Sequence, residues 1–90
     1  MYKLNFTKRA DDDIKMIQKS GSKSIRTKLV TILDELEEHP TTGTGQPELL
    51  KGRPNTYSRR LDQKNRVVYR IDNDIVEVLV LQALGHYDDK

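Results

Sequence analysis

The spacing of hydrophobic residues predicts two helices in the first half of the chain. Residues 2–6 alternate between apolar and polar side chains, as a short strand does, and Thr7 then offers a typical helix N-cap. The first helix carries its apolar stripe at Ala10, Ile14 and Ile17. The second helix is capped by Ser22 or Ser24 and ends before Pro40. Its apolar stripe consists of Ile25, Leu29, Ile32, Leu33 and Leu36. A Ser-Gly-Ser turn joins the two helices, so we expect an antiparallel pair.

Strands dominate the second half of the chain. The pattern predicts them over residues 56–61, 66–71 and 75–83. Short turns rich in Asp and Asn join these strands, which favours antiparallel hairpins. The last strand is almost continuously apolar, as is typical of a central strand buried on both faces. A further short strand is expected near residues 48–51.

The order of these elements is β-α-α-β-β-β, which places the chain in the α+β class. We expect the two N-terminal helices to pack on one face of a small, mostly antiparallel twisted sheet and to leave the other face open. A chain of 90 residues with 34% hydrophobic positions has no room for a second core, so residues 1–90 are expected to form a single domain.

The chain carries no signal for export or membrane insertion. No apolar run approaches the roughly 20 residues that span a bilayer, and no signal-peptide pattern opens the sequence. Cysteine is absent, which excludes disulfides and thiolate chemistry. We therefore expect a cytoplasmic protein with no membrane partner.

Charge is distributed unevenly, although the net charge is only +2. The stretch from Glu48 to Arg70 holds two anions, Glu48 and Asp62, and seven cations. The cations are Lys51, Arg53, Arg59, Arg60, Lys64, Arg66 and Arg70. Acidic residues gather elsewhere, for example at 11–13 and 34–38. This segregation predicts a basic face that attracts a polyanion, and the alternative is a solvated strand surface.

Strand alternation determines which cations share a face. An odd number of residues in the loop before the strand 66–71 puts Arg60 on the face of Arg66, and an even number puts Arg59 there. We prefer the odd count and keep Arg59 as a further substrate-binding candidate. The odd count gives an open polar face of Ser58, Arg60, Arg66 and Arg70.

A carboxylate, a histidine and several guanidinium groups suffice to cleave an RNA phosphodiester without a metal. The carboxylate takes the proton from a ribose 2′-OH, the cations stabilise the charge on the phosphate, and the imidazole protonates the departing 5′-oxygen. Glu48 and His86 suit the two proton transfers. Taken singly, Glu48 could equally be a strand-edge charge, His86 a solvated residue, and the arginines partners in cross-strand ion pairs.

Other polar groups receive no catalytic role. The Gly/Thr loop at 41–45 lacks the spacing of a phosphate-binding loop, and the acidic run at 11–13 is expected to be a charge cluster on a helix face. His39 marks a helix end. His39 and His86 lack the spacing of metal ligands, so no metal and no cofactor is expected.

Several short motifs in the second half of the chain form a specific combination. They are Gly45-Gln46-Pro47-Glu48-Leu49-Leu50-Lys51, Tyr57-Ser58-Arg59-Arg60-Leu61, Asn65-Arg66-Val67-Val68-Tyr69 and His86-Tyr87. With these motifs the chain resembles the YoeB/Txe toxins of the RelE superfamily of bacterial toxin-antitoxin systems. The resemblance covers the C-terminal half in detail and the whole chain in element order.

The resemblance implies a microbial RNase-like fold and an endoribonuclease that cleaves mRNA in the A site of the 70S ribosome. It also implies inhibition by a cognate YefM-type antitoxin, and it allows a homodimer, which nothing in the residues decides. It assigns Glu48 as the general base, His86 as the general acid and Arg66 as the residue that stabilises the transition state. It assigns phosphate contacts to Lys51 and Arg60, and the holding of the substrate nucleotide to Tyr87.

The chain departs from the family pattern at its end. The family typically ends at His-Tyr, whereas Asp88-Asp89-Lys90 follow here, so a role for a terminal carboxylate is not carried over. Two alternatives from other classes stay open, namely a ParE-like toxin that poisons gyrase without chemistry and a passive RNA-binding module. The presence of both Glu48 and His86 argues against the first, and the second predicts binding without cleavage.

Overall fold

The structure, a computed structural model, describes residues 1–85. Strand β1 (Lys3–Phe6) leads into the helices α1 (Lys8–Ser20) and α2 (Lys23–Glu38). The later strands are β2 (Glu48–Leu49), β3 (Thr56–Arg60), β4 (Arg66–Asp72) and β5 (Glu77–Gln82). This order confirms the predicted β-α-α-β-β-β pattern and adds β2, the further short strand that was expected near residues 48–51.

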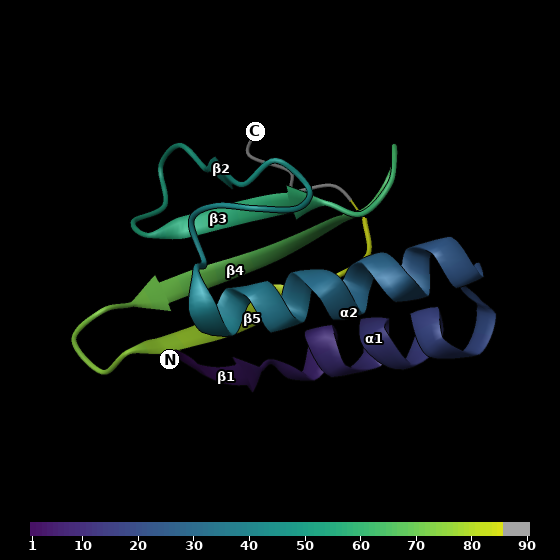
Figure 1. Ribbon diagram of the computed structural model, residues 1–90, viewed down its shortest axis with the longest axis horizontal. Helices are drawn as coiled ribbons and strands as arrows, with labels where there is room; N and C mark the ends of the chain where they lie inside the picture. Colours follow the sequence, from purple (N-terminus) through teal and green to yellow (C-terminus); the bar gives the residue numbers. More distant parts are fainter. Residues whose placement is uncertain (86–90) are drawn as a thin grey trace.

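Within residues 1–85 the strands form one sheet in the order β1-β5-β4-β3-β2 (Figure 1). β1 runs parallel to β5, and the other neighbours are antiparallel. The sheet is therefore mostly antiparallel, as expected. The first and the last strand of the described chain lie side by side, which brings segments far apart in the sequence together.

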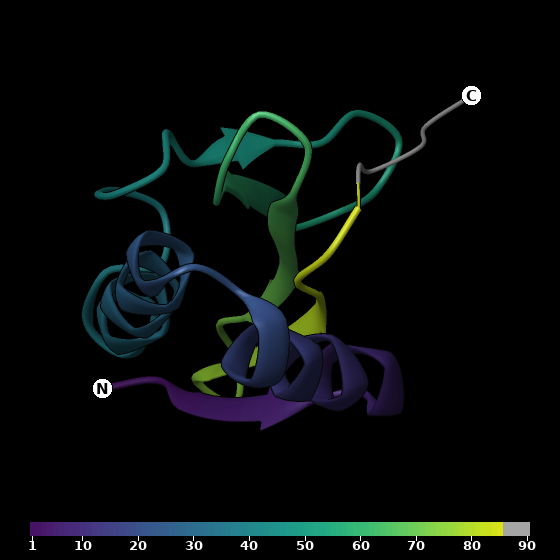
Figure 2. The same cartoon turned by 90° about the vertical axis from the view of Figure 1, so that its right-hand side faces the viewer.

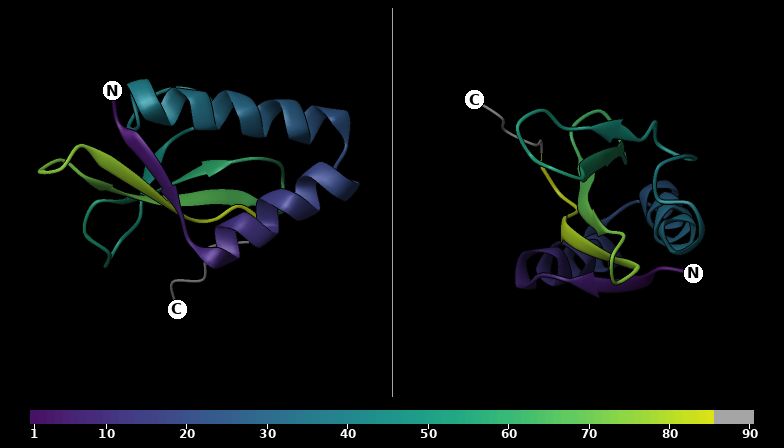
Figure 3. Two further views of the ribbon diagram at one scale, coloured as in Figure 1. Left: turned by 90° about the horizontal axis from the view of Figure 1, so that it is seen from below. Right: turned by 90° about the vertical axis from the view of Figure 1, so that its left-hand side faces the viewer.

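Both helices begin at predicted N-caps. Thr7 Oγ1 accepts a hydrogen bond from the backbone N–H of Ala10 at 3.1 Å, and Ser22 Oγ accepts one from Ile25 at 3.2 Å. These bonds satisfy donors that the first helical turn leaves open. Gly21 ends α1, where a Cβ would lie 2.6 Å from a backbone carbonyl oxygen of that helix. The helices run in opposite directions and diverge from this turn (Figure 3).

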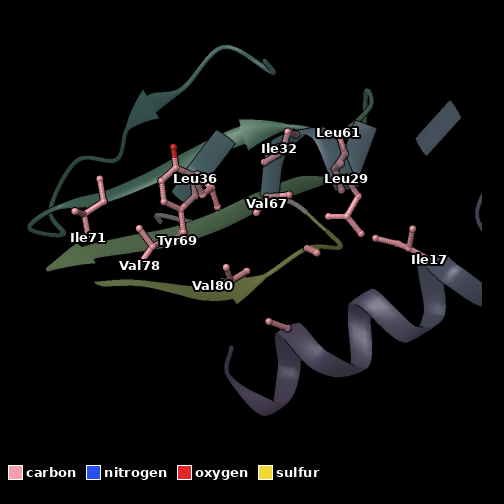
Figure 4. Packing of buried hydrophobic residues seen from close by; sticks show 12 residues of the cluster. Ile17, Leu29, Ile32, Leu36, Leu61, Val67, Tyr69, Ile71, Val78 and Val80 are labelled. Atoms are coloured by element: carbon pink, nitrogen blue, oxygen red, sulfur yellow. The ribbon is translucent and has the colours of Figure 1, made fainter. Parts of the chain in front are cut away.

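The hydrophobic core lies between the helices and one face of the sheet. It includes Ile17, Leu29, Ile32, Leu36, Val67, Tyr69, Ile71, Val78 and Val80 (Figure 4). In the view along the helices, α2 lies on one side of β4, and no helix of residues 1–85 covers the other side (Figure 2). The sheet thus has a covered face and an open face, as predicted. In this part of the chain, neither helix has the length and apolar character that crossing a membrane requires.

Strand β5 begins later than its sequence predicted. The prediction covered residues 75–83, but Ile75 is 61% exposed and Val76 has a φ of +53° in the preceding turn. Asp72 accounts for the longer turn, because its Oδ1 accepts hydrogen bonds from the backbone N–H groups of Asp74 and Ile75. The hydrophobic pattern alone did not predict that the Asp72 side chain accepts hydrogen bonds from these N–H groups and delays the start of the strand.

Strand β5 is also buried on one face rather than two. Val78 and Val80 are fully buried against the helices. Leu79 is half-buried, because it pairs with Arg70 of β4 on the open face of the sheet. The expectation that β5 is buried on both faces was therefore wrong. Its apolar residue Leu79 instead forms part of the surface of the open face.

Candidate active site

The strand register gathers the predicted base and the predicted transition-state arginine on the open face. Glu48 of β2 pairs with Ser58 of β3, which in turn pairs with Val68 of β4. Arg60 and Arg66 form the neighbouring pair, two residues along each strand. Residues two apart on a strand point to the same side. All of these side chains therefore share the face opposite the helices.

The guanidinium of Arg66 joins two of these groups. Its Nη1 donates a hydrogen bond to Ser58 Oγ at 3.1 Å and lies 3.5 Å from Glu48 Oε1. The second distance exceeds the roughly 2.7–2.9 Å of a tight charge-assisted bond, so the carboxylate keeps capacity to accept another proton donor. The side chain of Arg66 is 23% exposed and that of Glu48 is 64% exposed. Nε and Nη2 of Arg66 have no acceptor among residues 1–85 and can donate to a phosphate.

The β3–β4 hairpin puts Arg60, and not Arg59, on the face of Arg66. Arg60 and Arg66 are direct partners, which leaves the odd-numbered loop 61–65 between them and confirms the preferred count. Asp62 stabilises this loop, since its Oδ1 accepts hydrogen bonds from the backbone N–H groups two and three residues ahead, at 2.8 and 2.7 Å. Burial raises the pKa of Asp62, but the hydrogen bonds within the loop outweigh burial and hold that pKa below its ordinary value. The carboxylate of Asp62 therefore stabilises the loop 61–65 to which it belongs.

Arg59 lies on the helix side of the sheet, which corrects the expectation that it binds substrate. Its side chain is fully buried, and Nη1 lies 2.6 Å from Glu35 Oε1 of α2. Nε donates to the Tyr69 hydroxyl at 3.1 Å, and Nη2 donates to the carbonyl oxygens of His39 at 2.9 Å and Thr42 at 2.7 Å. A buried guanidinium with occupied donors does not reach an RNA phosphate. Strand alternation sends it into the core, where Glu35 balances its charge.

The loop between α2 and β2 wraps this buried ion pair and leads to Glu48. Glu35 accepts hydrogen bonds from the backbone N–H and the hydroxyl of Thr44, each at 2.8 Å. Burial raises the pKa of Glu35, but the bonds from Thr44 and Arg59 and the charge of Arg59 outweigh it and lower the pKa. Gly45 has a φ of +85°, and a Cβ there would lie 2.8 Å from a carbonyl oxygen of β3. The Gly/Thr loop thus ties α2 to the strand that holds Glu48.

Two further predicted cations lie at the edges of the cluster. Arg60 is exposed beside Arg66, and Lys51 is exposed in the turn that follows β2. In the described part of the chain, no hydrogen bond or ion pair joins the side chain of Arg60 or Lys51 to Glu48 or Arg66.

The predicted general acid, His86, and the predicted nucleotide contact, Tyr87, lie outside the described residues. The last described residue, Gly85, is tied to the site. Its carbonyl oxygen accepts a hydrogen bond from the backbone N–H of Arg66 at 3.1 Å, and its own N–H donates to Asn65 Oδ1 at 2.8 Å. Sequence reasoning placed Asn65 in a turn and in the motif around Arg66, but did not predict its contact with Gly85, because a partner 20 residues away leaves no local signal.

The groups that meet on the open face are a carboxylate, a hydroxyl and two guanidiniums. They can accept a proton and stabilise negative charge. Within residues 1–85, no three His, Cys, Asp or Glu side chains gather where they could share a metal ion.

Comparisons with known proteins by sequence and by structure lead to one family. Residues 6–87 match the YoeB-like toxins of bacterial type II toxin-antitoxin systems. The chain is 35% identical over 88 residues to Toxin RelK of Mycobacterium tuberculosis, an alignment that covers 97% of this chain and 100% of that protein. The YoeB/ParE toxin from Agrobacterium tumefaciens has a similar structure, with a TM-score of 0.85, 30% identity, and coverage of 94% of this chain and 99% of that chain.

YoeB from Staphylococcus aureus is also similar in structure. Its dimer gives a TM-score of 0.82 with 27% identity and covers 96% of this chain and 98% of that chain. In its YoeB-YefM complex the TM-score is 0.78 with 27% identity, and the match covers 97% of this chain and 99% of that chain.

Proposed function

The chain belongs to the YoeB-like toxins of bacterial type II toxin-antitoxin systems, and on this premise we propose that it is a ribosome-dependent endoribonuclease that cleaves mRNA in the A site. One observation carries the proposal. Arg66 lies 3.5 Å from Glu48 and 3.1 Å from Ser58 on the open sheet face, with Arg60 as its cross-strand neighbour. A base and a cation this close can act on a single phosphodiester.

Glu48 is the general base of the proposed reaction. Its exposed carboxylate can approach a ribose 2′-OH to within the roughly 2.6–3.2 Å that proton transfer requires. The 2′-oxygen then attacks the adjacent phosphorus, and the bond from phosphorus to the 5′-oxygen breaks. His86 gives its proton to that departing oxygen. The products are a 2′,3′-cyclic phosphate, which water can open to a 3′-phosphate, and a 5′-hydroxyl. These steps are proton transfers between side chains and RNA and use no cofactor.

Arg66 supplies the electrostatic part of catalysis. Among residues 1–85, its Nε and Nη2 have no acceptor, and they can bind the non-bridging oxygens as negative charge grows on them. Arg60 and Lys51 contact the neighbouring phosphates, and Tyr87 stacks on the base of the nucleotide. Arg59 takes no part in binding, because it lies in the core.

The expected partners are the ribosome, an antitoxin and a second copy of the chain. The small size of the site indicates the first, and the solved structures of relatives indicate the other two. The cationic cluster is short, so free RNA should bind weakly, and the ribosome would supply much of the positioning. The S. aureus relative is solved with YefM, and we expect a YefM-type antitoxin to cover the basic face of this chain. The same relative is solved as a dimer, and self-association of this chain is a further expectation.

A cleavage assay on translating ribosomes tests the proposal. Glu48→Ala and His86→Ala should each lower the cleavage rate by about 10²–10⁴-fold, because each removes one proton transfer. Glu38→Ala and His39→Ala are matched controls, since both residues are exposed at the C-terminal end of α2. Wild-type rates in both site variants would show that these residues are not the base and the acid.

Mapping the 5′ ends of cellular mRNA after brief expression tests the place of cleavage. The wild type should produce new 5′-hydroxyl ends within A-site codons, and His86→Ala should not. Inhibition of supercoiling without new RNA ends would instead favour a gyrase-poisoning toxin. RNA binding without new ends in either assay would favour a passive RNA-binding module.

A further inference from the structure

Residues 83–85 are held by side chains from distant elements, although they lie beyond strand β5. Ala83 is buried, and Leu84 and Gly85 are half-buried. Backbone groups of all three residues have side-chain partners from α1 or from the loop between β3 and β4. A segment outside the regular helices and strands keeps one position only where other groups bind it. The contacts here therefore indicate a segment that the fold keeps in one place.

Asp13 of α1 provides the central contact. Its Oδ2 accepts a hydrogen bond from the backbone N–H of Ala83 at 3.0 Å and another from that of Leu84 at 3.2 Å. These contacts span about 70 residues of sequence, with separations of 70 and 71. The side chain of Asp13 is 15% exposed, so water competes little for the carboxylate. Asp13 thus differs from its neighbour Asp12, whose carboxylate is 59% exposed and pairs with Lys8.

Arg9, one helical turn earlier, completes the contact with α1. Its Nε lies 3.5 Å from the same Oδ2 of Asp13, and its Nη2 donates to the carbonyl oxygen of Leu84 at 3.0 Å. The pair therefore binds Leu84 at both its N–H and its carbonyl group. Opposite charges four residues apart on a helix also hold each other in place.

The other side of the segment is bound to the active site. The N–H of Gly85 donates to Asn65 Oδ1 at 2.8 Å, and the carbonyl oxygen of Gly85 accepts from the backbone N–H of Arg66 at 3.1 Å. The segment thus connects α1 to the first residue of β4. In sequence, the residue after Gly85 is His86.

We propose that Asp13 and Arg9 are positioning residues, which fix residues 83–85 against the start of β4 and so set the place of Arg66. This inference rests on the proposed function. Neither residue touches the reacting atoms in this scheme. Their effect on the rate comes from geometry, because a displacement of about 1 Å in a catalytic group can lower a rate by about 10²-fold.

Kinetics on translating ribosomes, at a temperature where circular dichroism shows every variant folded, test the proposal. Asp13→Ala should lower kcat by about 10- to 100-fold and change KM by less than about twofold, because substrate binding does not involve Asp13. Asp13→Asn keeps an oxygen that accepts the same backbone hydrogen bonds and should recover most of kcat. Asp12→Ala is the matched control and should behave as the wild type, since Asp12 bonds to Lys8 and not to residues 83–85.

Amide hydrogen exchange supplies a readout that does not depend on catalysis. The N–H groups of Ala83 and Leu84 should be protected in the wild type and in Asp12→Ala, and should lose protection in Asp13→Ala. Unchanged protection in Asp13→Ala would overturn the contact itself. Lost protection with an unchanged kcat would overturn the positioning role.

The failure of this inference can be told from the failure of the proposed function. If the wild type and His86→Ala alike cleave nothing, the proposed function fails, and with it any catalytic role for Asp13. If the wild type cleaves and Asp13→Ala cleaves equally fast, only the positioning role is overturned.

Discussion

Arg59 and Arg66 lie on adjacent strands and each has a glutamate partner, but one site is closed and the other is open. Arg59 is fully buried, lies 2.6 Å from Glu35, and donates five hydrogen bonds to a carboxylate, a phenol and three carbonyl oxygens. Arg66 is partly exposed, lies 3.5 Å from Glu48, and has Ser58 as its other partner among residues 1–85. The closed site uses every N–H of its guanidinium, whereas the open site leaves N–H groups of Arg66 without an acceptor in the described part of the chain.

The difference shows how the same residue type serves stability in one place and function in another. A buried guanidinium must be fully bonded, because an unpaired buried charge costs several kcal/mol (roughly 3–5). An exposed guanidinium has no such requirement, so its remaining donors can bind a phosphate when one arrives. We therefore assign Arg59 to the fold and Arg66 to the chemistry, and four substitutions test this division.

Arg59→Ala should have the largest effect, and the effect should be on stability. The change leaves Glu35 without its charge partner and removes the hydrogen bonds that Arg59 donates to carbonyl oxygens of residues 39, 42 and 44. We expect the free energy of unfolding in urea to fall by about 3–5 kcal/mol. The exposed neighbour Arg60 is the control, since Arg60→Ala should change stability by less than about 0.5 kcal/mol. Equal losses in the two variants would contradict the division.

Arg66→Ala should lower the cleavage rate strongly and the stability only slightly, the reverse of what we expect for Arg59→Ala. We expect kcat for mRNA cleavage to fall by about 10²–10³-fold, as when a donor to a developing oxyanion is removed. Stability should change by about 1 kcal/mol or less, because the Arg66–Glu48 pair lies at the solvent boundary. Arg66→Lys keeps the charge without the planar fork and should recover only part of the rate. A stability loss as large as that of Arg59→Ala, with cleavage intact, would show that Arg66 is structural.

Glu35→Gln should weaken the pH dependence of stability. Burial raises the pKa of Glu35, but the bonds from Thr44 and the bonds and charge of Arg59 lower it below its ordinary value of 4.5. The unfolded state therefore binds the proton more readily, so this carboxylate stabilises the fold above pH 4.5 and stops doing so as the pH falls through the lowered pKa. Glutamine does not titrate. The stability gap between wild type and variant should be about 1–3 kcal/mol at neutral pH and should shrink in acid.

Urea unfolding at several pH values measures this gap. Glu38→Gln, an exposed position at the end of the same helix, should give a curve close to that of the wild type. A gap between wild type and Glu35→Gln that stays constant from neutral to acid pH would mean that Glu35 does not titrate with folding.

Ser58→Ala should have the smallest effect. The hydroxyl accepts one hydrogen bond from Arg66, so its loss frees the guanidinium without removing it. We expect kcat to fall by about 2- to 10-fold, the worth of one hydrogen bond. The hydroxyl of Thr31 bonds to its own helix backbone on the exposed side of α2, so Thr31→Ala is a control for loss of a hydroxyl. A loss as large as that of Arg66→Ala would point to Ser58 as a reacting group.

The parts of the fold that depend on near neighbours could be predicted from the sequence. Thr7 and Ser22 cap helices through backbone groups three residues away, and the alternation on β4 separates Tyr69 from Arg66 correctly. The start of β5 could not be predicted, because the side chain of Asp72 extends the turn before a run of residues that is apolar enough to be a strand.

The site was predicted less completely, because its contacts cross long stretches of sequence. The sequence does not distinguish Arg59 from Arg60 until the number of residues in the loop between β3 and β4 is known. The ion-pair partner of Arg59 is Glu35, which lies 24 residues earlier, in α2. Asp13 looked like one of three helix-face charges, and its contacts lie 70 residues later. Glu48 and Arg66 were singled out by motif, and the register of β2, β3 and β4 then brings them together.

A double-mutant cycle on Glu48 and Arg66 tests the central claim most directly. The kcat of Glu48→Ala, of Arg66→Ala and of the double variant would be measured on translating ribosomes, with Glu48→Ala combined with Arg70→Ala as a control pair. If the two side chains act on one phosphodiester, the double variant should lose little more than the worse single variant, because each change disables the same step. A loss equal to the product of the two single losses would mean that Glu48 and Arg66 act independently, and the shared site would be refuted.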